Sequence, residues 1–398
     1  MKRQFASLLV ARVTAAALQA VSGLLLARAL DPSLYGIVMS AMGVLFVWYV
    51  FCDLGVMTFV SKARASHNQA DVHGALRLNA GTSVLGGVVA ILLCATLPAS
   101  TSPELAIGLG ILALALALEK NTDTALCLPI ADGNRSTPAI SLTGRRIVST
   151  IVFVGLLFLY LDPILAYSLG YLAGAFAAQV HVRQYLRRSR VEGVGATPAR
   201  TIARRATPFL ITNVSVQSRS FDTAIVGILA SPAASGLYAA ASKITAPFML
   251  VPSTLTSLVL PHAVRAGVER AWAISLKLTA GAAVLGVALI PVSMLAEPII
   301  VFLLGADYAA ASSIMRWLLF GLPFVALSSP LSAVLQALHA ERFVAKNSVA
   351  FALVSLGLVA IGALIAGGTG AAIATSVTFI AKCTSLLIAI YILVRRSK

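Results

Sequence analysis

The sequence predicts an all-α polytopic membrane protein with about twelve transmembrane helices, arranged as two six-helix bundles around a central cavity. Of the 398 residues, 59% are hydrophobic and only 11% are charged, which leaves more apolar surface than a water-soluble protein of this length could bury. The apolar residues also gather into separate runs close to the ~20 residues that cross the hydrocarbon core of a bilayer. The net charge of +16 does not indicate nucleic-acid binding, because the charges fall between these runs.

The apolar runs give twelve expected spans, six in each half of the chain. The first follows Met1 closely, but it is longer than the apolar core of a signal peptide and contains Arg12, so we expect it to remain as a helix. The fifth is the shortest, and we expect Arg145 and Arg146 at its start to extend toward the membrane surface. The expected spans are Leu8–Ala29, Gly36–Phe59, Leu76–Leu97, Leu105–Leu126, Arg145–Leu161, Ile164–Val180, Pro208–Ala230, Gly236–Leu260, Leu276–Leu295, Ile314–Leu335, Val349–Ala366 and Ala371–Val394.

Lys and Arg residues concentrate in alternate connections between the expected spans. The connection that contains Lys62 and Arg64 and the Arg-rich segment 181–206 lie on the same expected side as both termini. The intervening connections, such as 162–163 and 231–235, are short and contain neither Lys nor Arg. Because connections rich in Lys and Arg stay in the cytoplasm, we expect both termini to be cytoplasmic.

The longest connection divides the chain into three parts. We expect an N-terminal six-helix lobe over residues 1–180, a basic cytoplasmic linker over 181–206 and a C-terminal six-helix lobe over 207–398. The motif Asp31-Pro32 with Gly36 recurs two hundred residues later as Ser231-Pro232 with Gly236, which suggests an internal repeat. The linker could fix the topology, bind anionic lipid or bind a glycosyltransferase, and we favour the first.

The seventh expected span carries two opposite charges near its middle. Arg219 and Asp222 are three residues apart, so on a helix they share a face with Thr212 and Ser215. A charge near the centre of the bilayer costs at least about 2.5–3.5 kcal/mol, so it needs a partner or a wet cavity. The two charges could simply neutralise each other and lock two helices together. We favour a role in lining a cavity.

The other charges inside the expected spans are mostly basic. Arg12, Lys243 and Lys382 lie within spans, whereas Asp53 and Asp222 are the only acids that we place well inside one. A wet cavity with a basic balance attracts anions such as a phosphate or diphosphate headgroup. The sequence therefore predicts an anionic cargo.

Motifs of catalysis are missing from the sequence. It has no nucleotide-binding GxxxxGK[ST] loop, no HExxH, no GxSxG, no DxD pair and no cluster of Cys and His with metal-ligand spacing. The four cysteines are scattered, and we interpret them as small hydrophobic residues. We therefore expect no enzymatic activity, with no catalytic residues, no cofactor and no metal site. Uphill work would then draw on an ion gradient or on the supply of cargo.

Several short motifs together resemble those of bacterial O-antigen and exopolysaccharide flippases, which belong to the multidrug/oligosaccharidyl-lipid/polysaccharide exporter superfamily. The resemblance extends over nearly the whole chain, although each motif alone is short. The motifs are Leu26-Ala27-Arg28-Ala29-Leu30-Asp31-Pro32-Ser33-Leu34-Tyr35-Gly36, Phe51-Cys52-Asp53-Leu54-Gly55, Phe221-Asp222 with Ile225-Val226-Gly227, Ser235-Gly236-Leu237-Tyr238-Ala239-Ala240-Ala241, Leu260-Pro261 and Leu304-Gly305-Ala306-Asp307-Tyr308.

The resemblance implies a two-lobed transporter of the bacterial inner membrane that works by alternating access. It would move an undecaprenyl-diphosphate-linked oligosaccharide from the cytoplasmic to the periplasmic leaflet, for the assembly of a surface polysaccharide such as the O-antigen of lipopolysaccharide or an exopolysaccharide. The expected partners are this lipid-linked oligosaccharide, membrane lipids and a polysaccharide polymerase or glycosyltransferases, with no nucleic acid.

On this hypothesis the residues have two roles. Candidates to bind the diphosphate or acidic sugars are Arg219, Lys382, Arg12 and Lys243. Asp222, and less directly Asp53, would carry a coupling proton or Na⁺. A carboxylate beside Arg219 is more easily kept ionised than protonated, which weighs against the proton.

Three other functions stay open at this point. The first is a cation-coupled multidrug exporter of the same superfamily, although cationic drugs would need unpaired acids that the spans largely lack. The second is a membrane-embedded glycosyl or acyl transferase, and the third is a scaffold for polysaccharide assembly that transports nothing.

Overall fold

Helices make up almost all of the chain that the computed structural model describes, which comprises residues 2–96, 102–188, 195–217 and 220–396. No β-strand occurs in these ranges. Within them, nine helices are long and apolar enough to cross a membrane. The predicted class, an all-α protein with many membrane spans, is confirmed.

Contacts between residues group the chain into two compact units. The first unit comprises Met1–Ala29 and Ala41–Ser220, and the second comprises Leu30–Ser40 and Phe221–Lys398. The end of the expected linker thus packs with the first unit. The division into lobes at 181–206 stays a prediction, because this grouping reports packing and not independent folding.

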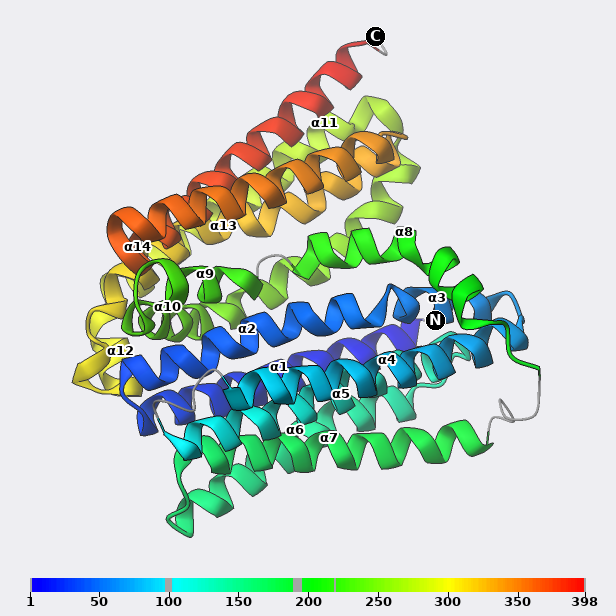
Figure 1. Cartoon of the computed structure of the whole chain (residues 1–398). Coiled ribbons are helices and arrows are strands. Elements are labelled where there is room, and N and C mark those ends of the chain that lie inside the picture. The colour runs from blue at the N-terminus through cyan, green and yellow to red at the C-terminus, as the bar shows by residue number, and fades with distance from the viewer. Residues whose placement is uncertain (1, 97–101, 189–194, 218–219, 397–398) are drawn as a thin grey trace. The chain divides into compact units, whose positions relative to one another are not determined.

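The first unit is a bundle of long helices in which α7 packs against both α5 and α6, α4 packs on α5, and α1 packs on α6 (Figure 1). A side chain at Gly170 or Gly174 of α7 would collide with the backbone of α6 at Ser149 or Arg145, so glycine lets these two helices approach closely. The helices of this unit are α1 (Lys2–Ala29), α2 (Pro32–Asp53, whose first residues belong to the second unit), α3 (Val56–Ala65), α4 (Gln69–Thr96), α5 (Pro103–Ala131), α6 (Ser136–Phe158), α7 (Pro163–Arg188) and α8 (Ala199–Gln217).

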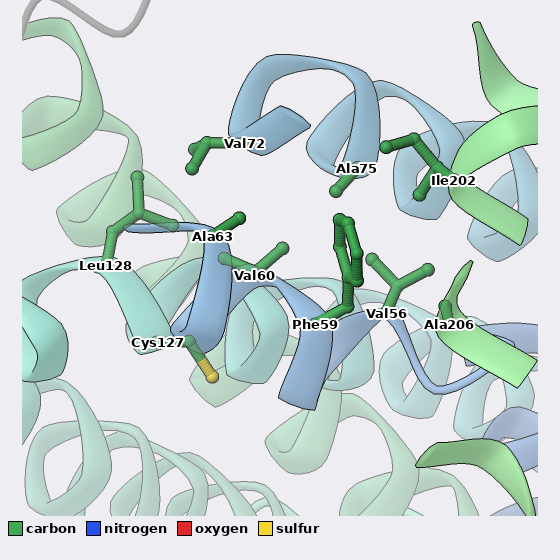
Figure 2. Close-up of a cluster of buried hydrophobic side chains, with 10 residues drawn as sticks. All are labelled: Val56, Phe59, Val60, Ala63, Val72, Ala75, Cys127, Leu128, Ile202 and Ala206. Carbon is green, nitrogen blue, oxygen red and sulfur yellow. The ribbon is translucent and has the colours of Figure 1, made fainter. Parts of the chain in front are cut away.

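The break between α2 and α3 turns the chain so that α3 can pack against α4, α5 and α8. Leu54 and Gly55 have φ values of 53° and 80°, which is the left-handed region that only glycine adopts without cost. Any side chain at Gly55 would also collide with the backbone of α8 at Ala206 and Leu210. Figure 2 shows the apolar cluster that results. It contains Val56, Phe59, Val60, Ala63, Val72, Ala75, Cys127, Leu128, Ile202 and Ala206.

Asp71 holds the beginning of the α8 segment against α4. Its Oδ1 accepts a hydrogen bond from Thr197 Oγ1 at 2.7 Å, and its Oδ2 lies 3.1 Å from Arg205 Nη1. Gly74, one turn along α4, leaves room for the backbone of Thr197. Arg204 is exposed, so α8 buries its apolar face and presents a basic one.

The second unit has α13 packed against both α11 and α14 (Figure 1). Helix α14 is divided by a kink at Ala366 and Gly367, and Gly362 and Gly370 meet across it. Its two parts correspond to the last two expected spans. The elements of this unit are α9 (Phe221–Leu229), α10 (Pro232–Thr245), η2 (Ala246–Met249), α11 (Leu250–Met294), α12 (Ala296–Leu304), η3 (Ala306–Tyr308), α13 (Ala311–Ala337) and α14 (Glu341–Arg396).

The motif that recurs after two hundred residues forms a reciprocal contact in the second unit. Helices α2 and α10 both begin with proline behind a capping side chain, Asp31 in one and Ser231 in the other. A side chain at Gly36 of α2 would collide with the first carbonyl group of α10, and one at Gly236 of α10 would collide with the first carbonyl group of α2. The two copies of the motif therefore pack on each other at matching positions.

This contact gives the first prediction. We expect Gly36→Ala or Gly236→Ala to destabilise the purified protein by about 1–3 kcal/mol, because the added methyl group must push the two helices apart. Thermal unfolding in detergent, monitored by size-exclusion chromatography, measures the loss of stability. Gly357→Ala in α14 is the matched control, because its methyl group meets no atom within 4 Å. Equal effects at all three positions would contradict the contact.

Candidate functional site

In the second unit, Asp222 lies in the first turn of α9 and is 4% exposed. Its Oδ2 accepts a long hydrogen bond from the Tyr238 hydroxyl of α10 at 3.5 Å. The same hydroxyl lies 3.5 Å from the Oγ1 atom of Thr375 in α14. Asp222 is therefore buried where α9, α10 and α14 meet.

The predicted cargo-binding residues are distributed over both units. Arg12 is exposed on α1 in the first unit, and Lys243 is partly buried in the last turn of α10. Lys382 lies seven residues after Thr375, so the two share a face of α14 about two turns apart. Its Nζ atom is 5.9 Å from the centre of the Phe379 ring. Arg219 lies outside the described residues.

In the first unit, Asp53 is 1% exposed at the end of α2. Its Oδ1 accepts hydrogen bonds from Asn79 Nδ2 at 3.1 Å and Thr124 Oγ1 at 2.9 Å. Its Oδ2 accepts the backbone N–H of Met57 at 3.2 Å. These bonds join the break after α2 to α4 and α5, so Asp53 has a structural role whatever else it does.

The donors that surround Asp53 continue as a chain of amides through the unit. Asn121 Nδ2 of α5 donates to Asn79 Oδ1 at 2.9 Å, and Gln179 Nε2 of α7 donates to Asn121 Oδ1 at 2.9 Å. Each amide donates in the direction of Asp53, and hydrogen bonds aligned in this way strengthen one another. The chain therefore links Asp53 to α4, α5 and α7 through hydrogen bonds.

The structure also brings together four charged side chains, two of which we expected at the membrane surface. We name them the buried ion cluster: Glu119 and Asp123 of α5 with Arg145 and Arg146 of α6. Arg146 Nη2 lies 2.5 Å from Glu119 Oε1, and Arg145 Nη1 lies 2.6 Å from Asp123 Oδ1. On its other side, the Arg146 guanidinium stacks 4.8 Å from the centre of the Tyr171 ring. The cluster has no net charge.

The buried ion cluster corrects two expectations. The placement of Arg145 and Arg146 at the membrane surface was wrong, because α6 begins at Ser136 and both residues are buried in its middle. The expectation that Asp53 and Asp222 were the only acids well inside a span was wrong too. The missed signal was the spacing of Glu119 and Asp123, which are four residues apart and therefore share a face of α5.

A different ion pair lies at the end of α5, outside the spans. Arg64 Nε and Nη2 donate to the two carboxylate oxygens of Asp132 at 2.7 and 3.0 Å, and Tyr185 donates to the same carboxylate at 2.8 Å. Partial burial opposes the charge on Asp132, but these hydrogen bonds and the Arg64 charge outweigh it and lower the pKa of Asp132. This bidentate pair resembles structural ion pairs elsewhere.

Two comparisons with known proteins find matches. The model of the family described as "Polysaccharide biosynthesis protein" matches residues 1–267. An inward-facing multidrug resistance MATE family transporter of the MOP superfamily is 12% identical, with a TM-score of 0.73 and 96% of each chain covered. The lipid II flippase MurJ in an inward closed conformation is 18% identical, with a TM-score of 0.73, 96% of this chain and 87% of that chain.

A third match is a MOP superfamily transporter from Pyrococcus furiosus, which is 13% identical with a TM-score of 0.64 and covers 98% of this chain and 96% of its own. No curated protein sequence matches. At these identities the solved structures establish the fold alone, and they agree with the predicted transporter fold.

The buried ion cluster gives the second prediction. We expect Glu119→Gln to destabilise the protein by about 3–5 kcal/mol, because it leaves Arg146 buried without its counter-charge. Asp132→Asn is the control at the more exposed pair, and we expect it to cost about 1 kcal/mol or less. Denaturant unfolding in detergent, monitored by tryptophan fluorescence, compares the stability of the two variants. Equal losses would mean that Arg146 finds another partner.

Proposed function

The chain belongs to the polysaccharide biosynthesis protein family, and from this premise we propose that it is a flippase for a lipid-linked oligosaccharide. It would carry an undecaprenyl-diphosphate-linked oligosaccharide from the cytoplasmic to the periplasmic leaflet by alternating access, for the assembly of a surface polysaccharide. The family match, which extends over residues 1–267, is the observation that carries the proposal. The fold shared with a lipid II flippase supports it.

The charges of the chain support an anionic cargo. The basic candidates Arg12, Lys243, Lys382 and Arg219 lie in segments expected to cross the membrane. Arginine and lysine recognise phosphate through charge-assisted hydrogen bonds. We assign these four residues to the diphosphate or to acidic sugars of the cargo.

The distribution of basic residues supports a location in the bacterial inner membrane with both termini in the cytoplasm. Arg187 at the end of α7 and Arg200 and Arg204 on α8 are exposed, on the side that the Lys and Arg distribution assigns to the cytoplasm. In this setting the protein would receive its cargo from glycosyltransferases and deliver it to a polysaccharide polymerase. In this proposal the protein transports its cargo and catalyses no reaction on it.

A second candidate function is a cation-coupled multidrug exporter. The observation that favours it is the similarity in fold to a multidrug resistance transporter, whose TM-score equals that of the lipid II flippase. Cationic drugs need acids without partners, whereas Glu119, Asp123 and Asp53 are all engaged by donors. We therefore favour the flippase.

The experiment that tests the function is mass spectrometry of polyprenyl-linked glycans in cells that lack the protein. We expect a complete lipid-linked repeat unit to accumulate, and the wild-type gene to restore its normal level. Arg219→Ala and Lys382→Ala should fail to restore it, whereas Lys346→Ala, an exposed lysine outside the proposed set, should succeed. Unchanged glycan pools together with increased drug sensitivity would favour the exporter, and a truncated repeat unit would indicate an enzyme.

Ion coupling at Asp222 gives a separate prediction. We expect Asp222→Asn to lower glycan export driven by an ion gradient by about 5- to 150-fold, the range of a typical coupling free energy. Tyr238→Phe should cause a smaller loss, because it removes one long hydrogen bond and leaves the charge. Export in cells whose proton or sodium gradient is collapsed identifies the ion.

The control for that experiment is Asp307→Asn, an exposed acid in the same unit. Full export by Asp222→Asn at normal protein levels would exclude Asp222 from coupling, and the same measurement on Asp53→Asn would then test the other candidate. Asp53→Asn replaces one accepting oxygen with an NH2 group that faces a donor, so its thermal unfolding is measured beside its export.

A further inference from the structure

Burying the four charges of the buried ion cluster in the first unit costs free energy, and their mutual attraction offsets only part of that cost. Removing a charge from water costs several kcal/mol even in real proteins, and well-packed apolar residues often replace a buried ion pair without loss. Four charges on α5 and α6 are therefore weak as a device for stability. Their arrangement is better explained by the binding of a ligand than by a contribution to stability.

Exposure differs sharply within the cluster. The side chains of Arg146, Glu119 and Arg145 are 8%, 9% and 9% exposed, whereas that of Asp123 is 27% exposed. Arg146 is enclosed by Glu119 on one side and Tyr171 on the other. Asp123 is therefore the most exposed member of the cluster.

Arg145 uses its hydrogen-bond donors incompletely. Its Nη1 donates to Asp123 at 2.6 Å, its Nη2 lies 3.5 Å from Glu119 Oε1, and its buried Nε has no hydrogen-bond partner among the described residues. Arg64, in contrast, engages both oxygens of Asp132 through Nε and Nη2 at 2.7 and 3.0 Å. The Nε–Nη2 edge of Arg145 thus lacks the close, two-oxygen acceptor that a guanidinium favours.

We propose that Arg145 binds a phosphate group of the lipid-linked cargo, and that Asp123 occupies its place when no cargo is bound. The proposal rests on the proposed function and adds to it a binding residue and a residue that competes with the cargo. A phosphate offers more oxygens and more negative charge than a carboxylate, so it can engage Nη1 together with the Nε–Nη2 edge.

The exchange suits the surroundings of both side chains. Arg145 Nε is buried and has no hydrogen-bond partner among the described residues, and the exchange requires that the Nε–Nη2 edge opens when Asp123 leaves Nη1. The displaced carboxylate moves to the side on which 27% of its side chain is already exposed. Glu119 stays with Arg146, so the cluster never holds an uncompensated positive charge in the empty protein.

The test measures binding of farnesyl diphosphate, with farnesol as the uncharged probe, to the purified full-length protein in detergent by calorimetry. We expect the wild type to bind the diphosphate and to prefer it over farnesol. Asp123→Asn should bind it about tenfold more tightly, because one charge-assisted hydrogen bond no longer has to be broken. Arg145→Gln should bind it at least about tenfold more weakly, and Arg145→Lys should be intermediate because it keeps the charge without the fork.

The matched controls are Asp132→Asn and Arg64→Gln, which disturb the bidentate pair in the same unit and should leave the affinity unchanged. Weaker or unchanged binding by folded Asp123→Asn overturns the proposal, because the loss of the competing carboxylate would then not free Arg145. If Arg145→Gln fails to fold, Asp123→Asn still decides, since Glu119 Oε1 remains 3.5 Å from Arg145 Nη2 as a counter-charge. Absence of diphosphate binding by both the wild type and Asp123→Asn also overturns it.

Failure of this proposal can be told apart from failure of the flippase function. If cells without the protein accumulate the lipid-linked repeat unit but Asp123→Asn does not bind the diphosphate more tightly, the function stands and the exchange is wrong. If Asp123→Asn binds more tightly but no repeat unit accumulates in cells without the protein, the phosphate site stands and the cargo is another phosphorylated lipid.

Discussion

A charge inside a membrane-spanning segment needs a partner. This requirement determines many of the polar contacts between the helices of this protein. The acids described within the spans lie among donors: Glu119 and Asp123 face arginines, and Asp53 receives three hydrogen bonds. In a medium with few water molecules, an unpaired ion would cost more than most packing interactions contribute. The helices that supply the partners therefore have to stay in register, and the chain of amides from α4 to α7 fixes that register further.

The sequence predicted the membrane class and most spans, because a run of about twenty apolar residues carries its own signal. It misplaced the start of α6, since Arg145 and Arg146 look like the edge of a membrane segment until the acids of α5 are set beside them. Pairing across helices depends on tertiary contacts that no local window of sequence contains. The contact of Gly36 with Gly236 was visible only as a recurring motif, and its reciprocal geometry needed coordinates.

The candidate site was predictable in part. Asp222 and Asp53 stood out because lone acids in apolar runs are rare, and the structure finds both buried. Tyr238, Thr375, Asn79 and Gln179 could not be singled out, since polar uncharged residues occur in many spans at little cost. Their importance comes from which neighbours they meet. In the same way, the unused edge of Arg145 is a property of its surroundings and not of its residue type.

Helix α2 is continuous, yet its first residues pack in one unit and the rest in the other. If the two halves of the chain arose by duplication, this arrangement amounts to an exchange of one helical segment, as when two copies of a protein swap an element. Cutting the gene in the segment 181–206 would leave the second half with a surface shaped for residues 30–40, which the first half carries. The two halves would therefore depend on each other to fold, although each has the architecture of a helical bundle.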